Sequence, residues 1–120
     1  MINVTMKPVN AKDRVKWIKD GEFLLIDLKN LRFDDDLKCV FRRAFRLMKD
    51  KKDIRYLLDL TDAYVSTKVV QYYMRKLKPF SKSISKRAYV GVRGYKLVAL
   101  MSINLVVKSE FKVCKDRQEA

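Results

Sequence analysis

The segment from Tyr56 to Val92 constrains the fold more than any other part of the chain. It reads YLLDLTDAYVSTKVVQYYMRKLKPFSKSISKRAYVGV, an apolar strand, a loop ending in Ser-Thr, an amphipathic helix and a second apolar strand. Two strands joined by a helix of this length are expected to lie parallel in one sheet, connected by a right-handed crossover. The segment therefore predicts an α/β fold.

The residues before this segment predict a hairpin and a further helix. Asp20-Gly21 separates the apolar runs 15–18 and 23–28, and Asp-Gly in that position is a hairpin signal because both turn residues need positive φ. The aspartates 34–36 suit the positive end of a helix dipole. The helix is expected to end within 50–53. Its buried stripe is expected at three- and four-residue spacing: Leu37, Val40, Phe41, Ala44, Phe45 and Met48.

The remaining elements are expected as three strands and two helices. Strands are predicted at Ile54–Leu60 and Ala88–Val92, with a last short strand at Phe111–Cys114. The segment 95–107 is apolar on nearly all sides and predicts a well-buried or partner-covering helix, and Asp116 begins a capping-box-like sequence.

Pro79 is expected to limit the helix that follows Ser66-Thr67. Proline lacks the N–H that a helix interior needs, so it ends or kinks the helix. Alternatively, the helix stops near Leu77 and a turn carries Phe80. In either case the buried stripe is expected to comprise Val69, Val70, Tyr73, Leu77 and Phe80.

These elements predict one α/β domain over residues 1–120. Its sheet is mixed and mainly parallel, with four or five strands, an N-terminal hairpin and helices on its faces. Residues 1–12 are expected to be irregular or an edge strand. A chain of 120 residues has the size of a single domain.

The absence of histidine excludes several kinds of catalytic and metal site. No Ser-His-Asp or Cys-His arrangement can form, and the two cysteines, Cys39 and Cys114, cannot make a four-thiolate zinc site. Both cysteines are expected to be reduced and to behave as small apolar side chains. We therefore expect no enzyme activity, no metal and no cofactor.

Nothing in the sequence predicts a membrane segment or a signal peptide. The longest apolar runs, Phe23–Ile26 and Leu97–Met101, are far too short to span a bilayer. The N-terminus has no charged region followed by an apolar core. We expect the protein to be cytoplasmic.

The chain is strongly basic, and its second half carries most of the excess. The formal net charge is +14, and the stretch from Lys68 to Lys115 has 12 basic residues and one acid, Glu110. Such an excess attracts nucleic acid, anionic lipid or an acidic protein, although a solvated surface explains it equally well. The basic face is expected to comprise Lys68, Arg75, Lys76, Lys78 and Lys82.

Aromatic and cationic residues alternate on the helix after Ser66-Thr67. Tyr72 and Tyr73 precede Arg75 and Lys76, a mixture typical of single-stranded nucleic acid binding. However, Tyr73 falls on the core stripe, which leaves Tyr72 as the outward ring, and no nucleic-acid fold signature is present. The sequence therefore ranks nucleic acid third among the expected partners.

Three further groups are candidate sites, each with a simpler structural interpretation. Asp27, Asp59 and Asp62 lie at or near strand ends, where open α/β sheets bind ligands, but Asp59 is expected to accept backbone N–H bonds in its turn. Arg93 and Gly94 could hold an anion before a helix, or the glycine could only permit a turn. Ser66 or Thr67 is expected to cap its helix, with phosphorylation as the alternative.

From about Trp17 onward the chain resembles the SpoIIAA-like proteins of the STAS class, which is named for sulphate transporters and anti-sigma-factor antagonists. The resemblance depends on an ordered set of residues and not on one motif. The set is Leu57-Leu58-Asp59-Leu60-Thr61-Asp62, Val65-Ser66, Pro79-Phe80-Ser81-Lys82, Lys86-Arg87-Ala88-Tyr89-Val90-Gly91-Val92, Asn104, and Phe111 with Asp116-Arg117-Gln118-Glu119-Ala120.

The resemblance implies a hairpin, a mostly parallel sheet and helices on its faces, and a kinship in shape with CRAL-TRIO lipid carriers. Two departures stand out. Phosphorylatable antagonists have Asp-Ser-(Ser/Thr)-Gly where this chain has Val65-Ser66-Thr67-Lys68, and the family continues into an apolar last helix beyond the position of Ala120. Any groove that this helix covers is expected to be open, or filled by another subunit.

Taken together, these features lead us to expect a non-enzymatic, STAS-like interaction or regulatory module. Its partner is expected to be another protein or a second copy of the chain. The expected partner surface involves the helix that starts at Ser66 and Thr67, the helix at 95–107 and the basic face. The runner-up is a carrier of a small ligand or lipid, and a basic nucleic-acid-binding protein comes third.

Overall fold

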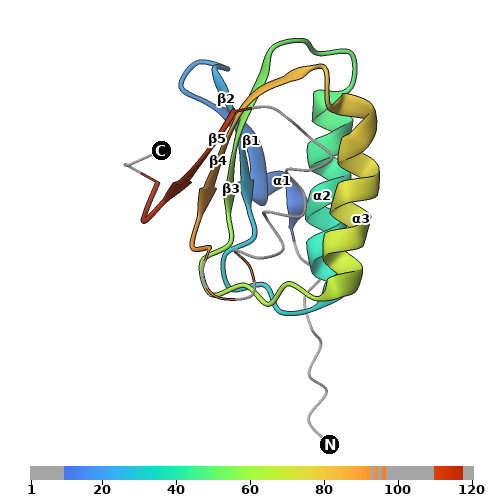
Figure 1. Cartoon of the computed structure of the whole chain (residues 1–120), viewed down its shortest axis with the longest axis vertical. Coiled ribbons are helices and arrows are strands. Elements are labelled where there is room, and N and C mark those ends of the chain that lie inside the picture. The colour runs from blue at the N-terminus through green and yellow to red at the C-terminus, as the bar shows by residue number, and fades with distance from the viewer. Residues whose placement is uncertain (1–9, 93, 95, 97–109, 118–120) are drawn as a thin grey trace, which may run out of the picture.

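The computed structural model describes residues 10–92, 94, 96 and 110–117, which form a five-stranded sheet with helices packed on it (Figure 1). The strands lie side by side in chain order. Strand β1 pairs antiparallel with β2, and the pairs β2–β3, β3–β4 and β4–β5 are parallel. The strands are β1 (Val15–Ile18), β2 (Phe23–Asp27), β3 (Ile54–Asp59), β4 (Ile84–Val90) and β5 (Glu110–Cys114). The predicted α/β fold with a mixed, mainly parallel sheet is confirmed.

Two long helices, α2 (Asp34–Met48) and α3 (Thr67–Leu77), lie next to each other on one face of the sheet (Figure 1). Helix α2 connects β2 to β3, and α3 connects β3 to β4. Right-handed crossovers that step in the same direction across a sheet place their helices on the same face. The connectivity therefore brings α2 beside α3.

The main core lies between this helix pair and the sheet. Alternate strand residues such as Leu24, Ile26 and Leu58 are buried there, as the two-residue period of a strand requires. The predicted stripe of α2 is fully confirmed: Leu37, Val40, Phe41, Ala44, Phe45 and Met48 are all buried. On α3, Val69, Tyr73 and Leu77 are buried, whereas Val70 and Phe80 are half-buried at the margin of the core.

A buried cluster of tyrosine hydroxyls fixes α3 over the middle of the sheet. Tyr73 of α3 hydrogen-bonds to Tyr56 of β3 and, at 2.9 Å, to Tyr89 of β4. Arg87, also buried, donates from Nη1 to the Tyr89 hydroxyl at 3.1 Å. Burial raises the pKa of Tyr56 and of Tyr73 well above that of an ordinary phenol, so both hydroxyls stay protonated. The three tyrosine hydroxyls and Arg87 Nη1 thereby satisfy one another.

The opposite face of the sheet carries a second, smaller apolar cluster. Leu25, Leu57, Val90 and Cys114 are buried there. They occupy the strand positions that alternate with those of the main core, so they point away from α2 and α3. Cys114 is a buried thiol of this cluster, and Cys39 is a half-buried thiol.

Several predicted element boundaries are confirmed. Asp20 and Gly21 have φ values of 57° and 85°, as the hairpin signal requires, and Lys19 joins them in the turn at 50°. Helix α3 ends at Leu77, and a 3-10 turn (Lys78–Phe80) carries Pro79 and Phe80, which was the second of the two expected arrangements.

Two boundaries were predicted wrongly, one helix was missed, and other predictions are not tested. Helix α2 ends at Met48 and not within 50–53, and Asp50 has a positive φ of 63°, which no α-helix accommodates. Strand β4 begins at Ile84 and not at Ala88, because Ile84 pairs with Ile54 and the two charged residues that follow concealed the strand in the sequence. A short helix, α1 (Ala11–Arg14), follows Asn10, whose side chain accepts a hydrogen bond from the Lys12 N–H. The expected strand at residues 2–6 lies outside the described residues. Most residues of the helices expected at 95–107 and after 116 also lie outside the described residues.

The backbone at Gly91 generates a stability prediction. A Cβ at Gly91, where φ is 76°, would lie 2.6 Å from the backbone nitrogen and Cα of Thr61. Gly21 has a similar φ of 85° but nothing within 4 Å. We expect Gly21→Ala to cost about 1 kcal/mol, from the left-handed backbone alone. Gly91→Ala should cost roughly 2 kcal/mol more, from the clash.

Urea unfolding followed by circular dichroism measures both free energies. Gly21→Ala serves as the control because it shares the backbone strain and lacks the contact. Equal losses in the two variants would show that strand β4 does not approach the turn after β3 as described.

Candidate functional site

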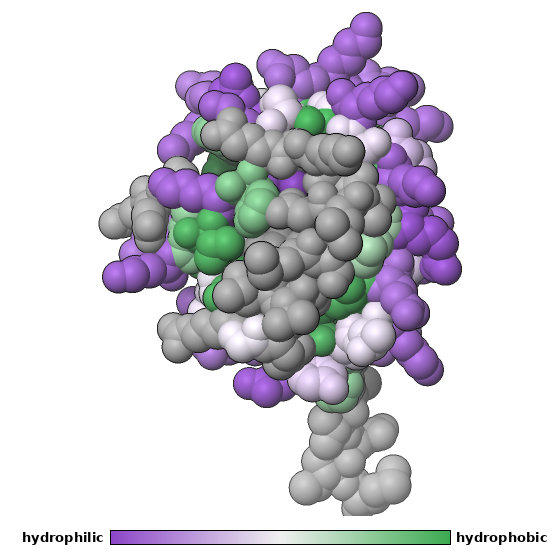
Figure 2. All heavy atoms as spheres, in the orientation of Figure 1, coloured by the Kyte–Doolittle hydropathy of each residue, from purple (hydrophilic) through white to green (hydrophobic). Residues whose placement is uncertain are grey.

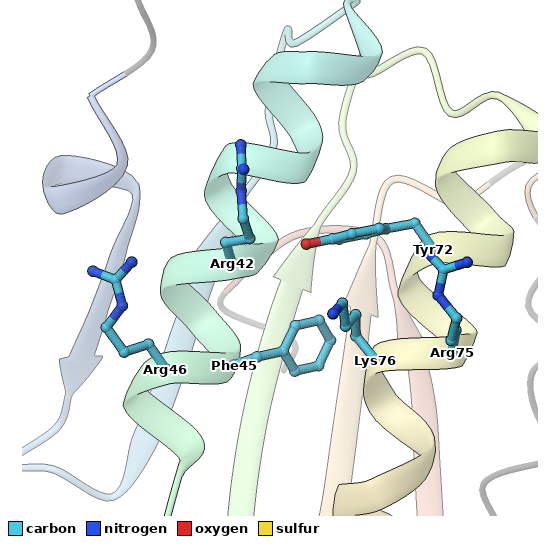
Figure 3. A pocket seen from close by; sticks show the side chains of 6 residues that line it. All are labelled: Arg42, Phe45, Arg46, Tyr72, Arg75 and Lys76. Carbon is cyan, nitrogen blue, oxygen red and sulfur yellow. The ribbon is translucent and has the colours of Figure 1, made fainter.

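A groove runs between the outer surfaces of α2 and α3 and is lined mainly by cations. Its volume is about 510 Å³, and Figure 3 shows how its side chains lie. The lining residues are Arg42, Phe45 and Arg46 of α2 and Tyr72, Arg75 and Lys76 of α3. We call these residues, with the neighbouring Lys38, the basic groove.

The helical period explains why these residues meet. Arg42 and Arg46 are one turn apart on α2, as Tyr72 and Lys76 are on α3, so each pair lies on one side of its helix. Phe45 belongs to the core stripe and is only 8% exposed, whereas Tyr72 is half-buried. In Figure 3 the Tyr72 ring reaches from α3 toward α2.

The Tyr72 ring is surrounded by positive charge from both helices. The Nζ atoms of Lys38 and Lys76 lie 5.7 Å and 5.8 Å from its centroid, and the guanidinium carbon of Arg75 lies 5.8 Å away. Cations at such distances are attracted to the negative face of an aromatic ring. The ring thus helps to hold several like charges near one another.

Acidic side chains are missing from this surface. Neither α2 after Asp36 nor any part of α3 contains an aspartate or a glutamate. Within the described ranges, the ion pairs join Arg14 and Arg117 to Asp27, Arg117 to Asp59, and Arg55 to Glu22, and none involves a residue of the basic groove. The groove therefore presents uncompensated positive charge. Viewed as in Figure 1, Figure 2 shows hydrophilic side chains along the edge of the molecule where α2 and α3 lie.

The structure divides the basic face that the sequence predicted. Arg75 and Lys76 line the groove, whereas Lys68, Lys78 and Lys82 are exposed and do not line it. Sequence reasoning missed the contribution of α2, namely Lys38, Arg42, Phe45 and Arg46. The predicted crossovers could have revealed this contribution, because two helices on one face bring their outward arginines and lysines together.

The predicted capping role of Ser66 is confirmed. Its Oγ accepts a hydrogen bond from the Val69 N–H at 3.2 Å, which satisfies one of the free donors in the first turn of α3. Thr67 is exposed as the first residue of the helix. Phosphorylation of either residue stays a prediction.

The strand-end carboxylates form an ion-paired cluster. Arg117 Nε lies 2.7 Å from Asp59 Oδ2, and another nitrogen of the same guanidinium lies 3.1 Å from Asp27 Oδ1. The other carboxylate oxygen of Asp59 accepts bonds from the N–H and the hydroxyl of Thr61, at 3.0 Å and 2.6 Å. The turn role expected for Asp59 is confirmed, whereas Arg117, 58 residues away, had no signal in the sequence.

The other strand-end candidates do not join this cluster. Asp62 is exposed in the following turn with a φ of 55°. Gly94 also has positive φ, at 55°, and Arg93 lies outside the described residues. Lys96 donates from Nζ to the Leu60 carbonyl at 3.1 Å, close to the end of β3.

The cluster at the strand ends sets the ionisation of Asp59. Burial acts to raise its pKa, but hydrogen bonds from the Thr61 side chain, the Thr61 N–H and Arg117 outweigh burial and lower the pKa of Asp59 below its ordinary value. Burial acts to lower the pKa of Arg117, but its hydrogen bonds to Asp59 and Asp27 outweigh burial and raise it. Across the described part of the chain, no three or more Cys, Asp or Glu residues come together as a metal site.

A second pocket, which we call the sheet-face pocket, lies over the smaller apolar cluster. Its volume is about 240 Å³. The apolar residues that line it are Ile18, Phe23, Leu25, Leu57 and Ala88, and Lys19 and Arg117 add positive charge. Among the helices in the described ranges, none has the length and apolar character that crossing a bilayer requires.

The ion pair at Asp59 predicts a pH dependence of stability. The pKa of Asp59 is lower in the folded chain than in the unfolded chain. Its carboxylate therefore adds to the free energy of unfolding at pH values above the unfolded pKa, and this stabilisation is lost as the pH falls through the folded pKa. Arg117→Met should remove part of this contribution. We expect the difference in unfolding free energy between the native protein and this variant to be largest near pH 7 and to shrink on acidification toward about pH 3.

Urea unfolding at a series of pH values measures this difference. Arg55→Met is the matched control, since it removes the exposed pair with Glu22 at 3.3 Å, and such surface pairs contribute about 0–1 kcal/mol. A difference for Arg117→Met that does not change with pH would contradict the assigned contact.

Comparison with known proteins gives no relative for this chain. No family model, no curated protein and no solved structure matches it. The resemblance to SpoIIAA-like proteins of the STAS class therefore stays a prediction, and the function has to be argued from the described residues.

Proposed function

We propose that the chain is a non-enzymatic binding module whose partner carries dense negative charge and docks in the basic groove. One observation supports this proposal above all others. Three cations, Lys38, Arg75 and Lys76, lie 5.7–5.8 Å from the centroid of one half-buried ring. Arg42 and Arg46 line the same groove, and no acidic side chain is among the groove residues.

Helix stability alone does not account for this gathering. Cations in the last turn of a helix gain about 0.3–1 kcal/mol from the helix dipole, which applies to Arg46, Arg75 and Lys76. Lys38 and Arg42 lie earlier in α2 and gain little. Two like charges about 8 Å apart repel by roughly 0.5 kcal/mol in water and about 2 kcal/mol at the effective dielectric of a protein surface. An anionic partner would relieve this repulsion.

The charge of the whole chain favours the same kind of partner. A net charge of +14 on 120 residues produces a long-range attraction for polyanions and speeds their encounter. A second copy of the chain docked groove to groove would bring identical cations together. The proposed partner is therefore a different molecule, and the STAS-like resemblance agrees with a binding role.

Retention on immobilised heparin, a generic polyanion, tests the groove. The variant Arg42→Glu/Lys76→Glu should elute at clearly lower salt than the native protein, because two of the converging cations become acids. Lys78→Glu/Lys82→Glu is the matched control, since it reverses two exposed lysines outside the groove and changes the net charge equally. If both double variants elute together, retention reflects net charge and the groove has no special role.

The sheet-face pocket supports a second candidate function, the carriage of a small amphipathic carboxylate. Five apolar side chains line a pocket of about 240 Å³, and Lys19 at its margin could neutralise an acidic group. Pockets of this composition, apolar with a few placed polar groups, are typical of small-molecule sites. The arrangement agrees with the carrier role that the sequence ranked second.

A thermal-shift titration with decanoate tests this candidate. We expect decanoate to raise the melting temperature of the native protein and to have little effect on Ala88→Phe, in which the new ring fills the pocket. Lys19→Gln should reduce the rise in melting temperature. Lys16→Gln should not, because Lys16 is exposed on β1 and lies outside the lining. An unchanged melting temperature of the native protein at saturating decanoate would exclude this ligand class.

A further inference from the structure

We infer that the partner in the basic groove is a single-stranded nucleic acid. Its phosphates pair with the arginines and lysines of the groove, and a base contacts the ring of Tyr72. This inference rests on the function proposed above and names the chemistry of the partner. It reverses the order in which the sequence ranked the partners, because the arginines of α2 enter the site only in the folded structure.

The groove has the wrong composition for a protein partner. At the centre of a protein interface, buried aromatic, apolar or arginine anchors fill pockets, whereas lysines are depleted there. Here Lys38, Arg75 and Lys76 lie 5.7–5.8 Å from the centroid of the Tyr72 ring, and Phe45, at 8% exposed, offers no open pocket. The exposed large apolar side chains of the described residues are Phe33, Tyr64 and Val113, none of which lines the groove.

The cations are arranged in a way that suits a nucleic acid backbone. Lys38, Arg42 and Arg46 follow one another at four-residue spacing, which places them roughly 6 Å apart along one side of α2. Such a row can meet successive phosphates of an extended strand. Arginine is also the residue that binds phosphate in a bidentate manner, and three of the five cations are arginines.

The shape of the site favours a single strand over a duplex. A duplex is read by an element that projects into a groove of the DNA, whereas α2 and α3 both lie flat on the sheet (Figure 1). Adjacent packed helices are about 8–10 Å apart, so the surface between them suits one strand. A base can reach the recessed Tyr72 ring only when it is free of a base-paired stack.

Recognition in this groove should tolerate most sequences. The lining contains no asparagine or glutamine, the residues that pair in a bidentate manner with the edge of adenine. Phosphate pairing and contact with an aromatic ring act on every nucleotide alike. The expected activity is therefore general binding of single strands.

Fluorescence anisotropy of the full chain with a labelled uridine dodecamer tests the inference. We expect binding at low salt that is tighter than binding to a duplex of the same length. Because single strands lose affinity with a logarithmic slope of about −0.7 per neutralised phosphate, engagement of all five cations predicts a slope near −3.5. Polyglutamate and vesicles of phosphatidylserine serve as the alternative polyanions.

Substitutions separate the charge contribution from the ring contribution. Tyr72→Leu keeps apolar packing but removes the aromatic face, and it should weaken binding about tenfold with the salt slope unchanged. Tyr72→Phe should bind like the native protein. Arg42→Glu/Lys76→Glu should flatten the slope to about −2, whereas the control Lys78→Glu/Lys82→Glu should leave the slope near the native value.

Three results would overturn the inference, and they can be told apart. If polyglutamate or vesicles bind through the groove while the dodecamer does not, the partner is a protein or a membrane and the proposed function survives. If the duplex binds as tightly as the single strand and Tyr72→Leu has no effect, the base contact is wrong. If every polyanion binds Arg42→Glu/Lys76→Glu with the same affinity as the control Lys78→Glu/Lys82→Glu, both the inference and the proposed function are wrong.

Discussion

Parallel pairing of β2, β3 and β4 is the constraint on which the rest of the structure depends. The connections β2–α2–β3 and β3–α3–β4 step in the same direction across the sheet. Because such crossovers are almost always right-handed, α2 and α3 lie together on one face. The hydroxyls of Tyr56, Tyr73 and Tyr89 tie α3 to both of the strands that it connects. Without this arrangement, Arg42 and Tyr72, thirty positions apart, would have no reason to meet.

The basic groove results from this arrangement, and the repulsion between its cations opposes the packing of α2 beside α3. Burial of apolar residues beneath α2 and α3 holds the helices together, while the like charges on their outer surfaces repel. Conflicts between local chemistry and folding stability are expected where a surface serves a function. The strand-end carboxylates show the contrary case, since Asp27 and Asp59 are neutralised by Arg117 and so contribute to stability.

Local signals in the sequence were sufficient for most of the fold. The Asp20-Gly21 turn, the stripe of α2 and the cap at Ser66 each depend on residues within a few positions of one another, and each is confirmed. The start of β4 was misplaced because Lys86 and Arg87 interrupt its apolar pattern, although pairing with β3 determines it. Arg117 and the contribution of α2 to the groove depend on neighbours in space, which no local pattern reports.

The central claim is that the surface shared by α2 and α3 binds single-stranded nucleic acid. The most direct measurement is an amide chemical-shift titration of the isotope-labelled chain with a uridine dodecamer. The account predicts that the shifted amides concentrate on residues 38–46 of α2 and 72–76 of α3. Shifts that spread evenly over the surface, or that gather on the opposite face around Leu25 and Leu57, would contradict it.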